Sequence, residues 1–203
     1  PLLAHYTSIT VLESILRNEQ LWFSNPLFMN DTQEIRFGIN EGIALFEASD
    51  EIEKACHSRE RFEILRHAFQ HYADEYIQKD VLDTYIFCLS EHHPDDHDGR
   101  LSMWRGYGGN GNGAAIVFDA GKIEPLEDSP LIIAKVRYET PKQQREWLHK
   151  YAADFAAILA NSNIPDDKLY LAAWSYMQAI KLYSVFTKHN GFHEEQEWRV
   201  VYV

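Results

Sequence analysis

The stretch HNGFHEEQEWRVVYV, His189–Val203, predicts a glycine-containing turn, an acidic patch and a final strand that begins at about Glu195. Because side chains alternate along a strand, we expect Glu195 and Glu197 on one face and Trp198 in the core. Arg199 would return to the face of Glu197 and could partner its carboxylate. The terminal strand therefore predicts a pair of carboxylates on one side of a sheet, with a solvated strand start as the alternative interpretation.

Working outward from this strand, further strands are expected where aromatic and β-branched residues gather. These segments are Leu2–Ser8, Gln20–Ser24, Thr84–Ser90, Gly113–Asp119 and Leu131–Glu139. Apolar residues at helical spacing predict helices over Ile9–Asn18, from Asp31 past Phe46, and over Glu51–Lys79, Leu101–Gly108, Lys142–Ala160 and Asp166–Thr187. The sequence therefore predicts a mixed α/β chain that forms one domain over residues 1–203.

Two local features concern the helices. Thr10 and Glu13 have the spacing of a capping box at the start of the first helix. Gly38 and Gly42 lie within the apolar stripe of the second helix, where they either weaken the helix or permit close packing.

Composition limits the classes of function. The 203 residues include 19 Lys and Arg against 31 Asp and Glu, which gives a formal net charge of −12. Such a balance disfavours a protein that coats nucleic acid, since that binding needs a basic surface. Two cysteines form no disulfide framework, and no stretch is apolar enough for a bilayer or a secretion signal. We expect a cytoplasmic protein without a membrane partner.

Polar side chains gather where the first strand meets the first helix. His5, followed by Thr7 and Ser8, offers hydrogen bonds that suit sugar hydroxyls or an amide. Helix capping by Thr7 or Ser8 is the alternative interpretation. A second polar cluster follows the predicted strand Gln20–Ser24 and is explained equally by turn chemistry; it comprises Ser24, Asn25, Asn30, Asp31 and Glu34.

Two aromatic residues precede a glycine-rich bend. Trp104 and Tyr107 are three residues apart on the predicted helical turn, so they would lie side by side. Such a pair suits the stacking of a flat ring such as nicotinamide or adenine, or simple core packing. The bend GGNGNG, residues 108–113, matches neither dinucleotide-binding nor P-loop spacing.

The segment His92–Asp98 concentrates three histidines and three aspartates in one loop. These residue types bind divalent metals, but the loop lacks a regular ligand spacing. We therefore predict a solvated loop and no metal, and keep a metal-dependent hydrolase as a separate hypothesis. Cys88 lies in a predicted apolar strand and is interpreted as a buried hydrophobe.

A series of short motifs resembles a known family. In order they are HYTS (5–8), L-x-x-I-L (12–16), LWFS (21–24), FMND (28–31), FCLSE (87–91), S-M-W-x-x-Y (102–107) and G-F-x-E-E-x-E-W-R (191–199). Their order and spacing resemble the bacterial family called domain of unknown function 2971. That family in turn resembles the ADP-ribosyltransferase superfamily, in particular its DNA- and RNA-modifying members that begin with a His-x-Thr motif.

The second resemblance implies an α+β fold, an ADP-ribosyltransferase-like split β-sandwich with inserted helices, in which NAD lies between two small sheets. It implies that His5 binds the NAD ribose with Thr7 beside it, that Tyr107 or Tyr85 covers the nicotinamide, and that Glu197 is catalytic. Glu195 would be the preceding acid of the Glu-x-Glu pair. The implied NAD-binding set is His5, Tyr6, Thr7, Ser24, Asn30, Ser90, Trp104, Tyr107 and Arg199. Cys88-Leu89-Ser90 stands where the superfamily has a Ser-Thr-Ser motif.

The implied activity is NAD-dependent mono-ADP-ribosylation, as in a bacterial toxin or phage-defence effector. NAD would be a substrate, no metal would be needed, and the acceptor would be a protein or nucleic acid, with an antitoxin or partner domain as a further partner. Cleavage of the nicotinamide–ribose bond produces an oxocarbenium-like centre that the Glu197 carboxylate would stabilise, while Glu195 would orient or deprotonate the acceptor. The alternative is a catalytically inactive nucleotide-sensing or protein-interaction module on the same fold.

Overall fold

The chain folds into two compact units in a computed structural model, which describes residues 1–29, 32–80, 83–124 and 127–202. We call Pro1–Phe28, Thr84–Tyr138 and Asn190–Val203 the sheet unit, and Met29–Asp83 and Glu139–His189 the helical unit. The chain passes from one unit to the other four times. A single domain over residues 1–203 stays a prediction, because compact units can belong to one domain.

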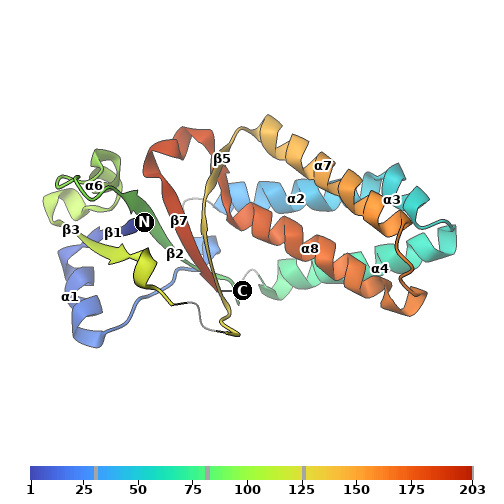
Figure 1. Cartoon of the computed structure of the whole chain (residues 1–203), viewed down its shortest axis with the longest axis horizontal. Helices are drawn as coiled ribbons and strands as arrows, with labels where there is room; N and C mark the ends of the chain where they lie inside the picture. Colours follow the sequence, from blue (N-terminus) through green and yellow to red (C-terminus); the bar gives the residue numbers. More distant parts are fainter. Residues whose placement is uncertain (30–31, 81–82, 125–126, 203) are drawn as a thin grey trace. The chain divides into compact units, whose positions relative to one another are not determined.

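The sheet unit is built on five antiparallel strands in the order β3-β1-β2-β7-β4 (Figure 1). The strands are β1 (Leu2–Ser8), β2 (Tyr85–His92), β3 (Gly113–Asp119), β4 (Leu131–Lys135) and β7 (Glu197–Tyr202). Two short strands, β5 (Arg137–Glu139) and β6 (Thr187–His189), form a separate two-stranded sheet. The prediction of a mixed α/β chain is confirmed, and the ADP-ribosyltransferase-like sandwich stays a prediction.

Alternation along the strands gives the five-stranded sheet two different faces. On one face Leu3 packs with Phe87 and Leu89; α1 (Ile9–Asn18) lies on this side, and we call it the α1 face. On the other, Ala4 and Tyr6 pack with Met103 of α6 (Leu101–Tyr107), and we call it the α6 face. Each strand therefore presents alternate residues to two separate environments.

Three strand predictions need correction. Gln20–Ser24 is not a strand: it contributes one isolated bridge, between Ser24 and Ile86. The segment Leu131–Glu139 breaks at Val136, whose N–H donates to the carbonyl of Glu197. The last strand begins at Glu197 and is preceded by a 3₁₀ helix, η6 (Asn190–Glu195). In each case, local β propensity did not decide where pairing stops.

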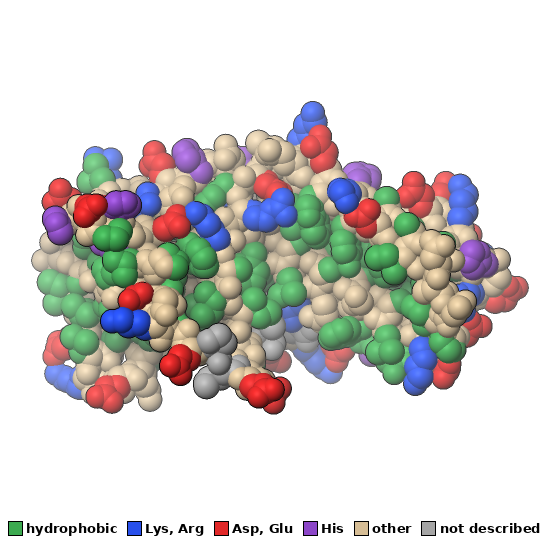
Figure 2. Space-filling view, viewed as in Figure 1, with side chains coloured by type: hydrophobic (Ala, Val, Ile, Leu, Met, Phe, Trp, Pro, Cys, Tyr) green, Lys and Arg blue, Asp and Glu red, His purple; other side chains and the backbone are tan. Residues whose placement is uncertain are grey.

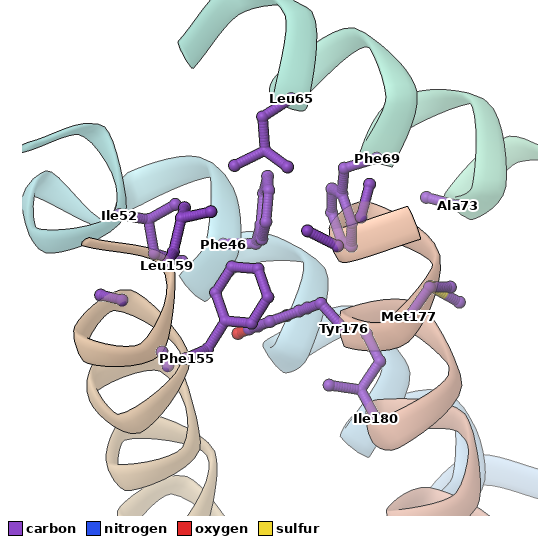
Figure 3. Packing of buried hydrophobic residues seen from close by; sticks show 14 of the residues in the cluster. Phe46, Ile52, Leu65, Phe69, Ala73, Phe155, Leu159, Tyr176, Met177 and Ile180 are labelled. Carbon is purple, nitrogen blue, oxygen red and sulfur yellow. The ribbon is translucent and has the colours of Figure 1, made fainter. Parts of the chain in front are cut away.

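The helical unit packs long helices around an aromatic core (Figure 3). Its helices are α2 (Thr32–Ala48), α3 (Asp50–Ala55), α4 (Arg59–Glu75), η2 (Tyr76–Asp80), α7 (Pro141–Ala160), η5 (Asp166–Lys168) and α8 (Leu169–Val185). The ring of Phe46 stacks on Phe69 with centroids 3.8 Å apart and meets Tyr176 edge-on at 5.0 Å. Burying such rings against one another supplies a large share of a domain's hydrophobic stabilisation.

Within this unit, Gly38 and Gly42 permit close packing of α2 on α8. A Cβ atom on Gly42 would lie 3.0 Å from Ile180, and one on Gly38 would collide with Ser184. The two glycines therefore serve packing.

The predicted helix Glu51–Lys79 is not continuous, because His57 adopts a left-handed φ of 61° and Ser58 caps α4 by accepting from Arg61 N–H. The chain therefore forms two helices here, α3 and α4, in place of the one predicted.

The first helix matches its predicted bounds, but its cap is a different residue. Ser8 Oγ accepts from Val11 N–H at 3.3 Å, so Ser8 and not Thr10 caps α1, which confirms the alternative interpretation of Ser8 as a helix cap. No residue of α1 is buried. The remaining short helices of the sheet unit are η1 (Pro26–Phe28), η3 (Gly109–Gly111) and η4 (Ala120–Lys122).

Surface charge of both signs is dispersed over the face shown in Figure 2, where Lys and Arg side chains stand among Asp and Glu side chains. None of the helices in the described ranges is both long and apolar enough to cross a membrane.

Candidate functional site

A buried ion pair lies on the α6 face at the pairing of β2 with β7. Arg199 Nε donates to Glu197 Oε1 at 2.8 Å and Nη2 donates to Oε2 at 3.3 Å, so the contact is bidentate. Arg199 is 0 % and Glu197 4 % exposed. Glu197 pairs across the sheet with Ser90, which is also buried. The strand alternation predicted for Glu197 and Arg199 thus gives a rigid, charge-compensated group.

Glu195 does not share a strand face with Glu197, so that prediction is wrong. Glu195 ends η6, and Gln196 follows with a left-handed φ of 44°, which interrupts the extended backbone before β7 begins. The carbonyl of Glu195 accepts a hydrogen bond from the buried Ser90 hydroxyl at 2.5 Å. Ser90 therefore fixes the turn that leads into β7, and Glu195 lies in this turn while Glu197 lies on the strand.

The short helix α6 is tied to β1 through aromatic contacts. Trp104 meets Tyr6 edge-on with centroids 4.8 Å apart, and its indole N–H donates to the Asp98 carbonyl at 2.7 Å. The Tyr6 hydroxyl accepts from the backbone N–H of Arg100 at 2.9 Å. Trp104 thus packs as part of the sheet unit, while Tyr107 at the end of α6 is 44 % exposed.

An open hollow of about 490 Å³ lies beside α6 and η6. It is lined by Arg100, Leu101, Ser102, His193, Glu194 and Gln196. A second open hollow, of about 480 Å³, shares Arg100 with the first. It is also lined by Pro1, Leu2, Glu91, His92, His93, Pro94 and Asp119. Both volumes fall within the usual range for small-molecule sites.

Arg100 is held in place by backbone groups. Its Nε donates to the Glu91 carbonyl and its Nη1 to the Glu194 carbonyl, each at 3.2 Å. Within the described ranges no carboxylate forms an ion pair with Arg100. The guanidinium is therefore a fixed positive charge that borders both hollows, with N–H donors left for a ligand.

His5 projects from the opposite face of the sheet. Its Nδ1 lies 3.0 Å from the Cys88 carbonyl, and its ring stacks on Phe87 with centroids 4.4 Å apart. Burial lowers the pKa of His5 below its usual value of 6.5, against a smaller opposing effect of the hydrogen bond to Cys88. Because Ala4, not His5, pairs in register with Ser90 and so with Glu197, the structure does not bring His5 and Glu197 into one pocket.

The residues predicted for the site thus divide by face. Those on or beside the α6 face are Tyr6, Ser90, Trp104, Tyr107, Glu195, Glu197 and Arg199. Those elsewhere are His5, Thr7 and Tyr85, whose strand positions place them on the α1 face, and Ser24, which bridges to β2. Asn30 and its neighbour Asp31 lie outside the described residues.

The histidine- and aspartate-rich loop is organised by its own backbone. The Asp96 carboxylate accepts from Gly99 N–H at 2.8 Å and from Asp98 N–H at 3.1 Å. These two hydrogen bonds hold the pKa of Asp96 below its ordinary value, and the bond from Gly99 has the larger effect. In the part of the chain that the structure describes, no three His, Cys, Asp or Glu side chains come together as metal ligands would.

Several residues of the hollow were not predicted from the sequence. Ser102 begins the S-M-W-x-x-Y motif, Arg100 lies two residues before it, and His193 and Gln196 stand at unspecified positions of the terminal G-F-x-E-E-x-E-W-R motif. Their position in or next to quoted motifs was a usable signal. What the sequence did not indicate is that η6 and α6 border the same space.

The sheet unit is thus an antiparallel α/β unit with ligand-sized hollows on its α6 side. Residues 103–200 match the model of the family described as “Protein of unknown function (DUF2971)”. The match, over just under half of the chain, supports the predicted resemblance to that family. Neither a curated protein nor a solved structure matches the chain. The resemblance to ADP-ribosyltransferases stays a prediction.

Proposed function

We propose that the sheet unit binds a small anionic ligand of the phosphate-bearing nucleotide class in the hollow beside Arg100. The observation that carries this proposal is the Arg100 guanidinium, which two backbone carbonyls orient and with which no described carboxylate forms an ion pair; Asp96 is close enough only for a weaker electrostatic attraction. A cation fixed in this way is a ready partner for phosphate oxygens, since the bond needs little side-chain ordering.

The other groups of the hollow suit such a ligand. Ser102 supplies a hydroxyl and Gln196 an amide. His193 Nδ1 donates a hydrogen bond to the Asn190 carbonyl at 3.0 Å, so Nε2 stays available as an acceptor. Leu101, 62 % exposed, offers an apolar surface for a base or ring. Glu194 is exposed, so its carboxylate can stay in water away from a bound phosphate.

Calorimetric titration tests this binding. ADP should bind the unmodified protein and adenosine should bind much more weakly, because adenosine lacks the phosphates. Arg100→Gln should weaken ADP binding by about tenfold to a hundredfold, as expected for the loss of a charge-assisted hydrogen bond worth about 1.5–3 kcal/mol. Arg105→Gln is the matched control: Arg105 is an exposed arginine of α6, the helix that Arg100 precedes, and it does not line the hollow. Equal ADP affinity of Arg100→Gln and the unmodified protein would contradict the proposal.

A second candidate is NAD-dependent ADP-ribosyl transfer at the same face. It is favoured by one observation: Glu197, Arg199 and Ser90 gather on the α6 face next to the turn that carries Glu195. Glu197 would stabilise the oxocarbenium-like centre formed as nicotinamide leaves. His5, on the opposite face, has no part in this version of the reaction.

Release of nicotinamide separates the two candidates. The protein is incubated with NAD, and free nicotinamide is measured by chromatography while NAD binding is measured by calorimetry. For a transferase, Glu197→Gln should lower the rate by about a hundredfold to a thousandfold. Glu195→Gln, in the turn and outside the buried pair, tests the acceptor role. NAD binding without nicotinamide release supports the binding function alone.

A further inference from the structure

A small cavity lies between α1 and the sheet, on the face opposite to the Arg100 hollow. Its volume is about 90 Å³. It is lined by His5, Val11, Ser14, Ile15, Gln20, Trp22 and Phe87, all within the sheet unit. The walls are mostly apolar, with a few polar groups, which is the usual composition of a ligand pocket.

His5 presents one defined hydrogen-bonding atom to this cavity. The Cys88 carbonyl can only accept, so Nδ1 carries the proton and donates across 3.0 Å. In the neutral ring, Nε2 then keeps its lone pair, and among the described residues none donates to it. Stacking on Phe87 fixes the plane of the ring. The lowered pKa of His5 keeps the ring in this neutral form at neutral pH.

We propose that this cavity is a separate ligand site for a small uncharged group that has an apolar body and one N–H or O–H donor, with His5 Nε2 as the acceptor. The size follows from the volume, which corresponds to about three waters at roughly 30 Å³ each and is below the roughly 150 Å³ that accommodates benzene. A branched alcohol or a primary amide of four or five heavy atoms fits this space, and a nucleotide does not. Trp22, 76 % exposed, forms an open side through which the group enters.

The matched probes are 2-butanol and 2-butanone, which share a carbon skeleton and differ in the hydrogen-bond donor. Binding is followed by NMR titration of the Trp22 indole N–H and the His5 ring nitrogens in the full chain. We expect 2-butanol to bind at least fivefold more tightly than 2-butanone. His5→Phe, which keeps a stacked ring but lacks the acceptor, should abolish this preference. Val11→Phe, a change at a half-exposed wall position, should prevent both probes from binding.

Three results would overturn the proposal: equal affinity of the unmodified protein for the two probes, an unchanged preference for 2-butanol in His5→Phe, or no shift of the Trp22 signal with either probe. The Val11→Phe result decides the location of binding even if His5→Phe does not fold. Since nucleotide binding is not required at any step, failure here leaves the Arg100 proposal untouched.

Discussion

The two faces of the five-stranded sheet differ in the charged groups that they bury. The α6 face buries a full ion pair, Arg199 with Glu197, and places the fixed charge of Arg100 at its border. The α1 face has an apolar core of Leu3, Phe87 and Leu89 with the His5 ring, whose pKa is lowered by burial, and it is covered by a helix with no buried residue. Adjacent residues such as His5 and Tyr6 thus belong to different sites, so proximity in sequence is a poor guide to a shared site on a strand.

The largest effect is expected from removing the buried cation of the α6 face. Arg199→Met should lower the free energy of unfolding by about 3–5 kcal/mol, because it removes the bidentate partner of the buried Glu197 carboxylate. The double variant Arg199→Met with Glu197→Leu should recover most of this loss, since both charges are then absent. Urea unfolding measures both. A double variant as unstable as the single one would show that the ion pair is not the reason.

A smaller effect is expected at the turn before β7. Ser90→Ala removes the buried hydroxyl that donates to the Glu195 carbonyl and should cost about 1–3 kcal/mol of unfolding free energy. Ser102→Ala, at a partly exposed serine of the Arg100 hollow, is the control and should change stability by less than about 0.5 kcal/mol. Equal effects in urea unfolding would contradict a special role of Ser90.

On the α1 face, the next prediction concerns the N-cap of helix α1 and its effect on the stability of that helix. Ser8→Ala should destabilise α1 by about 1 kcal/mol, because the Val11 N–H loses its acceptor. Since α1 buries no residue, the loss should appear as faster amide hydrogen exchange in α1 and not in β2. Thr10→Ala, at the position suggested by the capping-box spacing, should leave exchange unchanged. Faster exchange in Thr10→Ala alone would reverse this assignment of the cap.

The smallest effect concerns pH. Because the folded-state pKa of His5 lies below 6.5, the unfolded chain takes up this proton first as pH falls. The contribution of His5 to stability is therefore present above about pH 6.5 and is lost between that pH and the folded-state pKa, by at most about 1.4 kcal/mol per pH unit. His5→Phe should flatten the dependence of unfolding free energy on pH in this window, and His97→Gln, in the exposed loop, should not. An unchanged slope in His5→Phe would be contrary to this expectation.

The sequence predicted elements well where a long pattern was present. Helix α1 has its predicted bounds, and α7 begins one residue earlier than predicted, at Pro141. Prediction from the sequence failed where the backbone conformation of a single residue interrupts a helix or a strand. The left-handed φ of His57 breaks the predicted helix Glu51–Lys79, and that of Gln196 separates Glu195 from β7. Neither residue is glycine, so the residue type did not indicate a left-handed backbone conformation at either position.

Of the site, sequence reasoning predicted that Glu197 and Arg199 share a face, since a strand period of two follows from the backbone alone. It could not predict that Arg100 borders the same space as His193, because that depends on how a helix and a turn far apart in the chain pack beside one sheet.

By itself, the amino-acid order determined helix α1, most of helix α7 and the shared strand face of Glu197 and Arg199, since these depend on neighbours within a few residues. Only the tertiary structure decided that Ala4, Ser90 and Glu197 pair in register across three strands and that His5 lies on the opposite face of the sheet. The reason is strand register: a shift of one residue exchanges the two faces, and register is fixed by long-range pairing and not by any single strand.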